Sequence, residues 1–549
     1  MKARELTTRF LTRGFFPDHL TPPFTSEHLS NAYPAILQYL RPLRATARKK
    51  LGSYARAKTV RHSVPKRRLS RRFLSVPNPL HHVLVSRTIA RHWSNLQKFC
   101  DQSKISLSRP ILGVERAIEP ETPKRFEPRE RALRSIGKRF LLKADLARFY
   151  PSVYTHSIPW ALHGKDAARK DNGLYGNRID ERVRESQDKQ TGGIPIGPDT
   201  SYLIAEVVAT AIDVAIEKRV GDLHGTRYID DYHLYFDSYN DAEAGLAALH
   251  EAAASLELEV NDLKTEIVPT PEALEPDWKT ELRARTVDST STDQQSQILD
   301  LFSRAAALAN QYPHDNVLTF VAKMIEGLDV AQKHWPLCES LLLRSAIAEP
   351  KILRVVLDLY VDPHFTPNSE RVEQTVRAIC IEHGRLQHGN EVLWALWAAR
   401  TLDIHLDADI AEIISAIDDD LVALTALHLD DENRITGLNK AFWQQSMSKE
   451  NLYSHHWLLA YEASVKGWLT PPRGRDFTIA DDFFKLLRAH DVSFYDVTAT
   501  DVDSESDYED SASDNNGDEL EFDNTIPDSD DNADEDEIEI EDAELQDPF

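Results

Sequence analysis

Two adjacent carboxylates, Asp230 and Asp231, most constrain how this chain can fold. They lie in GTRYIDDYHLYFDS (225–238), between stretches rich in β-branched and aromatic residues. Apolar runs on both sides of a tight Asp-Asp corner predict a β-hairpin with both acids at its tip. Carboxylate oxygens are the ligands that Mg²⁺ prefers, and one or two of them plus substrate phosphates form its usual protein site. Taken alone, the motif favours the plainer alternative of a solvated turn.

A third acid, 85 positions upstream, changes this balance. Residues FLLKADL (140–146) are typical of a buried strand, and Asp145 falls near its end. A buried carboxylate is costly unless a cation or another partner compensates it. Asp145, Asp230 and Asp231 together would supply the acidic cluster of a two-metal phosphoryl-transfer site. In such a site one ion activates the attacking hydroxyl and the other stabilises the leaving pyrophosphate.

Four segments, in this order, resemble the motifs of reverse transcriptases. DLARFYPSV (145–153) resembles motif A, TGGIPIGPDTSYLIAE (191–206) motif B, YIDD (228–231) motif C, and LEVNDLKTEI (258–267) motif D. Each motif is weak by itself, but four in the correct order and spacing favour a polymerase palm over coincidence. The resemblance implies an RNA-directed DNA polymerase, which is a nucleotidyltransferase.

The resemblance also implies roles for individual residues. Asp145, Asp230 and Asp231 would be the catalytic and metal-binding acids, holding two Mg²⁺ ions for which Mn²⁺ can substitute. Tyr150 stands where the family places an aromatic gate against the ribose 2′-hydroxyl; the alternative is an ordinary core aromatic. Lys264 would place a cation near the triphosphate, although a lone Lys after a strand is usually solvated.

Motif B carries one departure from the family. Gly193, Gly197 and Ser201 are expected to let the backbone approach the incoming base and template, since glycine has no Cβ. Ile196 stands where most of the family has Gln, and it cannot make the hydrogen bond of a Gln side chain. This replacement resembles the abortive-infection and other defence-associated bacterial reverse transcriptases, some of which make DNA without a template or from unusual primers. It puts templated copying in doubt, but not polymerisation.

Charge is distributed very unevenly along the chain. The formal net charge is −25, yet residues 501–549 contain 23 acidic residues and no Lys or Arg. The first 100 residues contain 20 Lys and Arg and only three acids, which predicts a phosphate-binding surface. The alternative is a basic tail or solvated helix face without a defined ligand. The predicted nucleic-acid contacts are Arg48, Lys49, Lys50, Lys66, Arg67 and Arg68, and Arg72 is the predicted triphosphate contact within 71–93, which resembles the family's fingers motif.

The predicted fold class is α+β, a right-hand polymerase with an antiparallel palm sheet and helices. The predicted parts are a basic, largely helical N-terminal and fingers region (1–100), the palm (101–285), an all-α HEAT-like helical-repeat domain replacing the thumb (286–495), and a disordered acidic tail (496–549). Between 163 and 190 the chain is polar and is expected to form an exposed excursion. From about 290 to 490, short amphipathic helices recur roughly every 35–45 residues, as in a HEAT-like solenoid.

Three widely spaced cysteines, Cys100, Cys338 and Cys380, give neither a disulfide framework nor a Cys-x-x-Cys metal pair. No apolar run reaches membrane-spanning length, and the basic N-terminus lacks the apolar core of a secretory signal. We therefore expect a cytoplasmic protein without a membrane partner.

The sequence thus predicts an RNA-directed DNA polymerase of bacterial antiphage defence, with template-independent or protein-primed synthesis left open. Its expected partners are dNTPs, RNA or DNA, a dedicated noncoding RNA or accessory protein, and further copies of itself. One alternative is a retron-like enzyme that copies a dedicated RNA. Another is a catalytically inactive nucleic-acid-binding scaffold, against which the three clustered carboxylates argue, since in a dead site they would add only repulsion. The template, primer, phage trigger, subunit number and role of the tail stay open.

Overall fold

The computed structural model describes residues 1–18, 20–40, 56–67, 70–285, 287–288 and 291–500. The predicted contacts Arg48, Lys49, Lys50 and Arg68, the side chain of Arg67 and the acidic tail from residue 501 lie outside these described residues. Lys66 is exposed on strand β1. None of the described helices is both long and apolar enough to cross a membrane.

The N-terminal region combines helices with a β-hairpin. Its elements are α1 (Ala3–Thr12), α2 (Glu27–Asn31), α3 (Tyr33–Leu40), β1 (Val60–Arg67), β2 (Ser70–Val76), α5 (Pro79–Arg91) and α6 (Trp93–Cys100). The expectation of a largely helical region was wrong for residues 60–76, where β1 and β2 pair antiparallel from Val60 opposite Val76. Val60, His62 and Val64 are buried at every second position, as a strand requires. Arg61 and the basic run that follows at 66–68 hide this period in the sequence.

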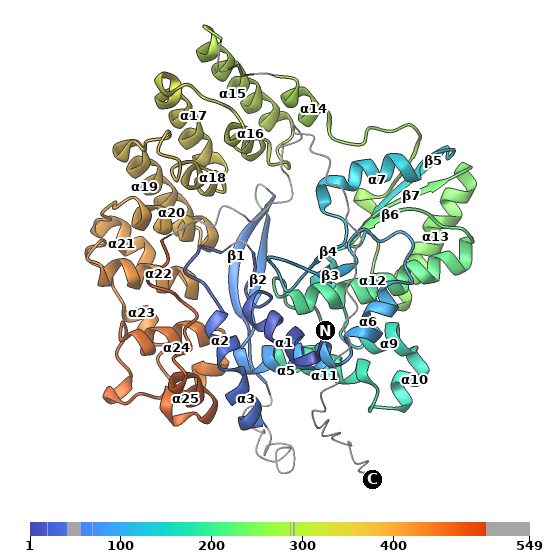
Figure 1. The fold of residues 1–549 in the computed structure, drawn as a ribbon, viewed down its shortest axis with the longest axis horizontal. Coiled ribbons are helices and arrows are strands. Elements are labelled where there is room, and N and C mark those ends of the chain that lie inside the picture. Colours follow the sequence, from blue (N-terminus) through green and yellow to red (C-terminus); the bar gives the residue numbers. More distant parts are fainter. Residues whose placement is uncertain (19, 41–55, 68–69, 286, 289–290, 501–549) are drawn as a thin grey trace, which may run out of the picture. The chain divides into compact units, whose positions relative to one another are not determined.

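A four-stranded antiparallel sheet, in the order β6-β7-β5-β8, forms the centre of the next part (Figure 1). Its strands are β5 (Phe140–Asp145), β6 (His224–Tyr228), β7 (Asp231–Phe236) and β8 (Glu266–Pro269). Helix α13 (Tyr239–Ser255) packs on β5 and β7, and the long helix α12 (Asp199–Val220) packs on α13. The predicted α+β class with an antiparallel sheet, the buried strand before Asp145 and the helix expected at 200–220 are thereby confirmed.

The remaining elements of this part surround the sheet and its helices. They are β3 (Pro110–Leu112), β4 (Ile118–Pro120), η2 (Lys124–Phe126), α7 (Glu127–Arg134), α8 (Phe149–Ser152), α9 (Ser157–His163), α10 (Lys165–Lys170), α11 (Tyr175–Ser186) and η3 (Asp262–Lys264). The exposed excursion expected at 163–190 is present at 164–173, where every residue except Ala168 is exposed, but the expectation was wrong for α11. Ile179 and Val183, one helical turn apart, are both buried, and α11 packs against α5 and α9.

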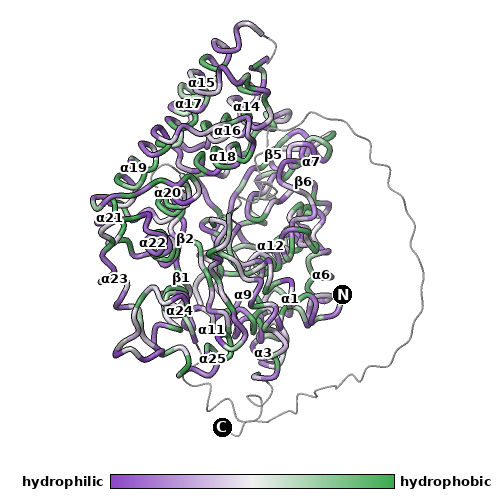
Figure 2. The backbone as a smooth tube through the Cα atoms, turned by 60° about the vertical axis from the view of Figure 1, so that its left-hand side comes forward, coloured by the Kyte–Doolittle hydropathy of each residue, from purple (hydrophilic) through white to green (hydrophobic). Residues whose placement is uncertain are grey.

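From residue 277 onwards the described chain contains helices joined by loops, and its only β-type pairs are isolated bridges. The α-helices are α14 (Asp277–Arg283), α15 (Gln294–Gln311), α16 (Val317–Glu326), α17 (Trp335–Ala348), α18 (Ile352–Leu359), α19 (Ser369–Arg385), α20 (Gly389–Thr401), α21 (Ala408–Ser415), α22 (Asp420–Asp431), α23 (Ala441–Gln444), α24 (Trp457–Lys466) and α25 (Asp482–Ala489). Hydrophobic and hydrophilic stretches alternate along them, as amphipathic helices require (Figure 2). The all-helical character is as predicted, while the HEAT-like repeat stays a prediction.

The β1–β2 hairpin is docked onto these C-terminal helices by buried polar contacts. The Arg71 guanidinium makes a two-pronged pair with Glu391 on α20, with 2.7 Å between Nη2 and Oε2. His62 Nδ1 lies 2.7 Å from Asp419 Oδ2, and Trp457 on α24 donates its indole N–H to the Val76 carbonyl over 3.1 Å. Residues from both ends of the chain consequently share one hydrophobic core.

Replacing Arg71 by Ala tests this docking, because it leaves the Glu391 carboxylate, only 3% exposed, without its cation. Burial would raise the pKa of Glu391, but hydrogen bonds and charge from Arg71 outweigh burial and lower it. Since breaking a buried pair from one side is strongly destabilising, we expect a loss of about 3 kcal/mol in chemical denaturation. Arg61→Ala is the control, because it removes a cation that lies over the exposed Phe73 ring. It should lower the free energy of unfolding by no more than about 0.5 kcal/mol. Equal losses would contradict the docking role.

Candidate active site

The ends of two neighbouring strands bring the three predicted acids together. Asp145, the last residue of β5, lies directly opposite Asp231, the first residue of β7, in the antiparallel register. Asp230 occupies the turn between β6 and β7, and its carbonyl accepts a hydrogen bond from Leu146 N over 3.2 Å. Residues 85 positions apart in the sequence thus meet at one end of the two central strands of the sheet.

Burial and crowding raise the pKa values of two of these carboxylates. Burial, followed by repulsion from Asp231 and Asp145, raises the pKa of Asp230 above its ordinary value. Burial also raises the pKa of Asp231, against the opposing charge of Lys124. A divalent cation would relieve this repulsion, and the donors are all carboxylate oxygens, the ligands that Mg²⁺ and Mn²⁺ prefer. The three side chains therefore fit the expected metal ions chemically.

Two lysines lie close to the acids. Lys264, at the end of η3, places Nζ 2.6 Å from Asp145 Oδ2, and its role near a triphosphate stays a prediction. Lys124, on η2, lies 3.9 Å from Asp231 Oδ2 and 4.2 Å from the centre of the Tyr228 ring. Sequence reasoning missed Lys124, because a single Lys 21 positions before motif A carries no recognisable signal.

Tyr150 lies on α8, close enough to the acids to sense their charge. Burial raises the pKa of its phenol, and the next cause is the negative charge of Asp230. Arg72, exposed on β2, acts on Tyr150 with the opposite sign. Asp230 and the predicted triphosphate contact, Arg72, therefore both lie within electrostatic range of the predicted gate.

The motif B glycines make close approaches to the chain itself. Gly193 has a φ of +81°, and a Cβ added there would lie 3.0 Å from the Pro151 carbonyl oxygen. Gly197 has a φ of +129°, and an added Cβ would lie 2.5 Å from the ring of Pro17. Glycine is thus needed at both positions for the backbone and for neighbouring prolines, besides any role toward a base.

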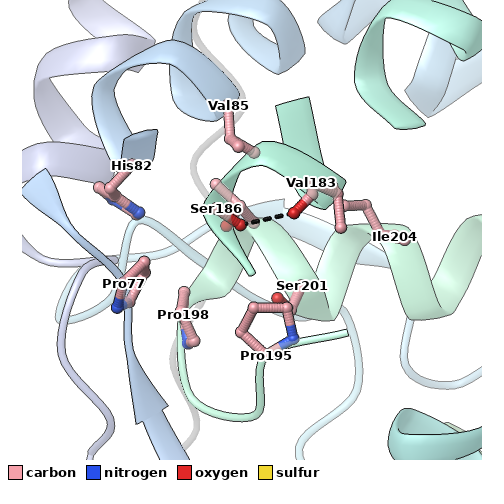
Figure 3. Close-up of a pocket in the computed structure, with 10 residues that line it drawn as sticks. Pro77, His82, Val85, Val183, Ser186, Pro195, Pro198, Ser201 and Ile204 are labelled. Atoms are coloured by element: carbon pink, nitrogen blue, oxygen red, sulfur yellow. Dashed lines mark hydrogen bonds between the residues drawn. The ribbon is translucent and has the colours of Figure 1, made fainter. Parts of the chain in front are cut away.

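Ser201 lines a small internal pocket, together with residues of α5 and α11 (Figure 3). Its side chain is 3% exposed, and most of the lining is apolar, as at Val85, Val183 and Ile204. His82 also lines the pocket, and its Nε2–H donates a 3.1 Å hydrogen bond to the Phe10 carbonyl, since a carbonyl oxygen can only accept. Burial lowers the pKa of His82 to about 4, so this histidine is neutral and hydrogen-bonded at neutral pH.

A second cluster of metal-ligating side chains lies far from motif C in the sequence. Among the described residues, His383, His388 and Glu391 have ligand atoms within 4.8 Å of one another. The two imidazole Nδ1 atoms are 3.0 Å apart and share a hydrogen bond. Both oxygens of Glu391 already accept from Arg71, so this cluster is explained by the docking of the hairpin.

Comparison with known protein families matches residues 64–291 to the family described as reverse transcriptase (RNA-dependent DNA polymerase). Residues 64–291 are therefore similar to a reverse transcriptase domain. The match contains all four motif segments and confirms the predicted RNA-directed DNA polymerase, a nucleotidyltransferase, for this part of the chain. The domain accounts for less than half of the 549 residues.

One solved structure that this chain is similar to is telomerase from Candida albicans in complex with a TWJ fragment of telomeric RNA. The sequence identity is 12% and the TM-score 0.30, a value too low to support an argument. The likeness covers 62% of this chain and 65% of the telomerase chain, so this chain spans less than two thirds of it. A comparison with curated proteins gives no match.

Replacing one of the three carboxylates by a neutral amide should stabilise the protein when no divalent cation is bound. Folding raises the pKa of Asp230. The free energy of unfolding therefore falls as the pH rises and Asp230 ionises. In EDTA we expect the free energy of unfolding of Asp230→Asn to exceed that of wild type by an amount on the order of 1 kcal/mol, and its unfolding temperature to be higher accordingly. Asp237→Asn, at the exposed far end of β7 and paired with Lys138, is the control. A lower unfolding temperature for Asp230→Asn would show that the cluster does not repel Asp230.

Proposed function

We propose that the whole protein is a DNA polymerase whose active site consists of Asp145, Asp230 and Asp231. A 3′-hydroxyl, or a protein hydroxyl, attacks the α-phosphorus of a deoxynucleoside triphosphate, and pyrophosphate leaves. The observation that carries the proposal is the register pairing of Asp145 with Asp231 inside a reverse transcriptase domain. RNA or DNA and dNTPs are the substrates that this chemistry requires.

Asp145 and Asp230 hold two Mg²⁺ ions in this proposal, with Asp231 beside them. When bound, the ions supply charge stabilisation for the attacking oxygen and the departing pyrophosphate. The ammonium group of Lys264 lies 2.6 Å from the Asp145 carboxylate. Once cations neutralise Asp145, Lys264 is proposed to bind a phosphate oxygen instead. Arg72 contacts the triphosphate from the hairpin.

Tyr150 is proposed to select deoxynucleotides. Its ring lies on α8, inside motif A and five residues after Asp145, and the influence of Asp230 on its pKa supports a place beside the acids. A rigid ring at this place would collide with a 2′-hydroxyl, the group that separates RNA from DNA precursors. Gly193, Gly197 and Ser201 form the adjoining motif B segment, and Lys66 with its basic neighbours is proposed to follow the nucleic-acid backbone.

The biological setting we propose is bacterial antiphage defence. Ile196 in place of the family's Gln supports it, together with a helical C-terminal region in place of a thumb. The four-part division at residues 100, 285 and 495, the HEAT-like repeat and a cytoplasmic location belong to the same proposal. Three free cysteines, all buried, agree with a reducing compartment. A dedicated noncoding RNA, an accessory protein or self-assembly would complete the system.

Asp145→Asn tests the catalytic assignment. The substitution keeps the shape of the side chain but removes the charge that a cation needs, so we expect incorporation to fall by several orders of magnitude with little loss of nucleic-acid binding. Primer extension and filter binding measure the two effects. Asp237→Asn, outside the cluster, should polymerise as wild type. Near-normal incorporation by Asp145→Asn would remove the assignment.

The nature of the product separates the proposed setting from its alternatives. Incubation with each labelled dNTP, with and without RNA, followed by protease treatment and sequencing, should give a biased or protein-linked product. Label whose mobility changes with protease would show priming by a protein hydroxyl. A defined complementary DNA would support the retron-like alternative instead. No incorporation with any primer, template, Mg²⁺ or Mn²⁺ would favour the inactive scaffold.

A further inference from the structure

The hairpin tip that carries Asp230 has an unusual backbone. Ile229, immediately before Asp230, has a φ of +57°. A β-branched residue is strained in this region, which glycine or asparagine normally occupies. The surrounding structure must therefore hold Ile229 in place, and the direction of the following Asp230 depends on that restraint.

Two side chains hold both backbone polar groups of Ile229. The Ile229 N–H donates to Ser108 Oγ over 2.8 Å. The Ile229 carbonyl accepts from Arg227 Nη1 over 3.0 Å. Ser108 comes from the loop before β3, more than a hundred residues upstream, and Arg227 from strand β6. Neither residue lies within the four motif segments, although Arg227 directly precedes motif C.

Arg227 is itself fixed by two carboxylates of helix α12. It is completely buried and donates to Glu206 Oε1 over 2.7 Å and to Asp213 Oδ2 over 2.8 Å. Ser108 Oγ donates to Glu206 Oε2 over 3.0 Å, so its lone pair is available to accept from Ile229. Ser106 and Ser103 supply further donors to Glu206 and Asp213, each over 2.6 Å.

These contacts form a continuous route from a palm helix to the catalytic turn. Buried charges are costly unless hydrogen bonds satisfy them, and here a guanidinium and two carboxylates are joined by several good bonds. A purely structural network would need no contact with the turn. In this one, both Ser108 and Arg227 end on the strained residue next to Asp230.

We propose that Glu206, Arg227 and Ser108 are positioning residues that aim the Asp230 carboxylate for divalent-cation binding. This inference rests on the proposed function and deepens it. Removing the Ser108 hydroxyl frees the Ile229 N–H, lets the turn relax and weakens the geometry at Asp230, while the dNTP contacts stay intact. Substitutions that disturb the supports of metal ligands typically lower metal affinity or activity by about 10–100-fold.

Ser108→Ala in the full-length protein tests the proposal through Mn²⁺ binding, measured by electron paramagnetic resonance without nucleotide. We expect the Kd for Mn²⁺ to rise about tenfold. With nucleotide, the Mg²⁺ concentration for half-maximal incorporation should rise similarly, while KM for dNTP at saturating Mg²⁺ stays constant. Ser108→Thr, which keeps the hydroxyl, should restore both values toward wild type.

Ser345→Ala is the matched control, since it removes a buried helical hydroxyl that donates to Leu341 O over 2.7 Å, far from the palm in the sequence. It should leave the Mn²⁺ affinity unchanged. An unchanged Mn²⁺ Kd in Ser108→Ala, or an equal loss in Ser345→Ala, overturns the positioning role. A wild-type protein that binds Mn²⁺ but never incorporates dNTP would instead overturn the proposed function, and the Mn²⁺ comparison would still decide the positioning role.

Discussion

The pairing of β5 with β7 is the interaction on which the candidate site depends. Six consecutive residue pairs, from Phe140 opposite Phe236 to Asp145 opposite Asp231, fix the register of these strands. Because side chains alternate along a strand, a slip of one residue would turn Asp145 to the opposite face. Leu142, Tyr232 and Leu234 are buried in the same core, so the hydrophobic pattern that stabilises the sheet also sets the position of the acids.

The same register creates an electrostatic conflict that the rest of the site must contain. Burial, and after it repulsion between like charges at the strand ends, raises the pKa values of Asp230 and Asp231. Lys264 offsets part of that charge at Asp145, and one backbone hydrogen bond, from Leu146 N to the Asp230 carbonyl, helps to hold the turn. A local arrangement that opposes folding in this way is typical of a functional site, where stability is given up for chemistry.

Sequence reasoning succeeded where the signal is local. A buried strand ending at Asp145, a tight turn at Asp230 and the helices of 296–402 each have a short-range pattern, and all are present. It failed where distant segments decide the structure. The strand period of Val60, His62 and Val64 was obscured by basic neighbours, and Ile179 with Val183 was outweighed by the polar composition of 163–190. Ser108 and Lys124 carry no local signal, because only the fold brings them to the turn.

Strand β2 connects the two ends of the chain to the candidate site. Adjacent residues of a strand point to opposite faces, and Arg71 points to Glu391 on α20, while Arg72 is exposed and acts on Tyr150 beside the acids. The backbone of the same strand also reaches motif B, since Ser75 N donates to the Ile196 carbonyl over 2.8 Å. The C-terminal helices therefore support the hairpin that borders the site, and a change in their packing would reach Arg72 and motif B through one rigid strand.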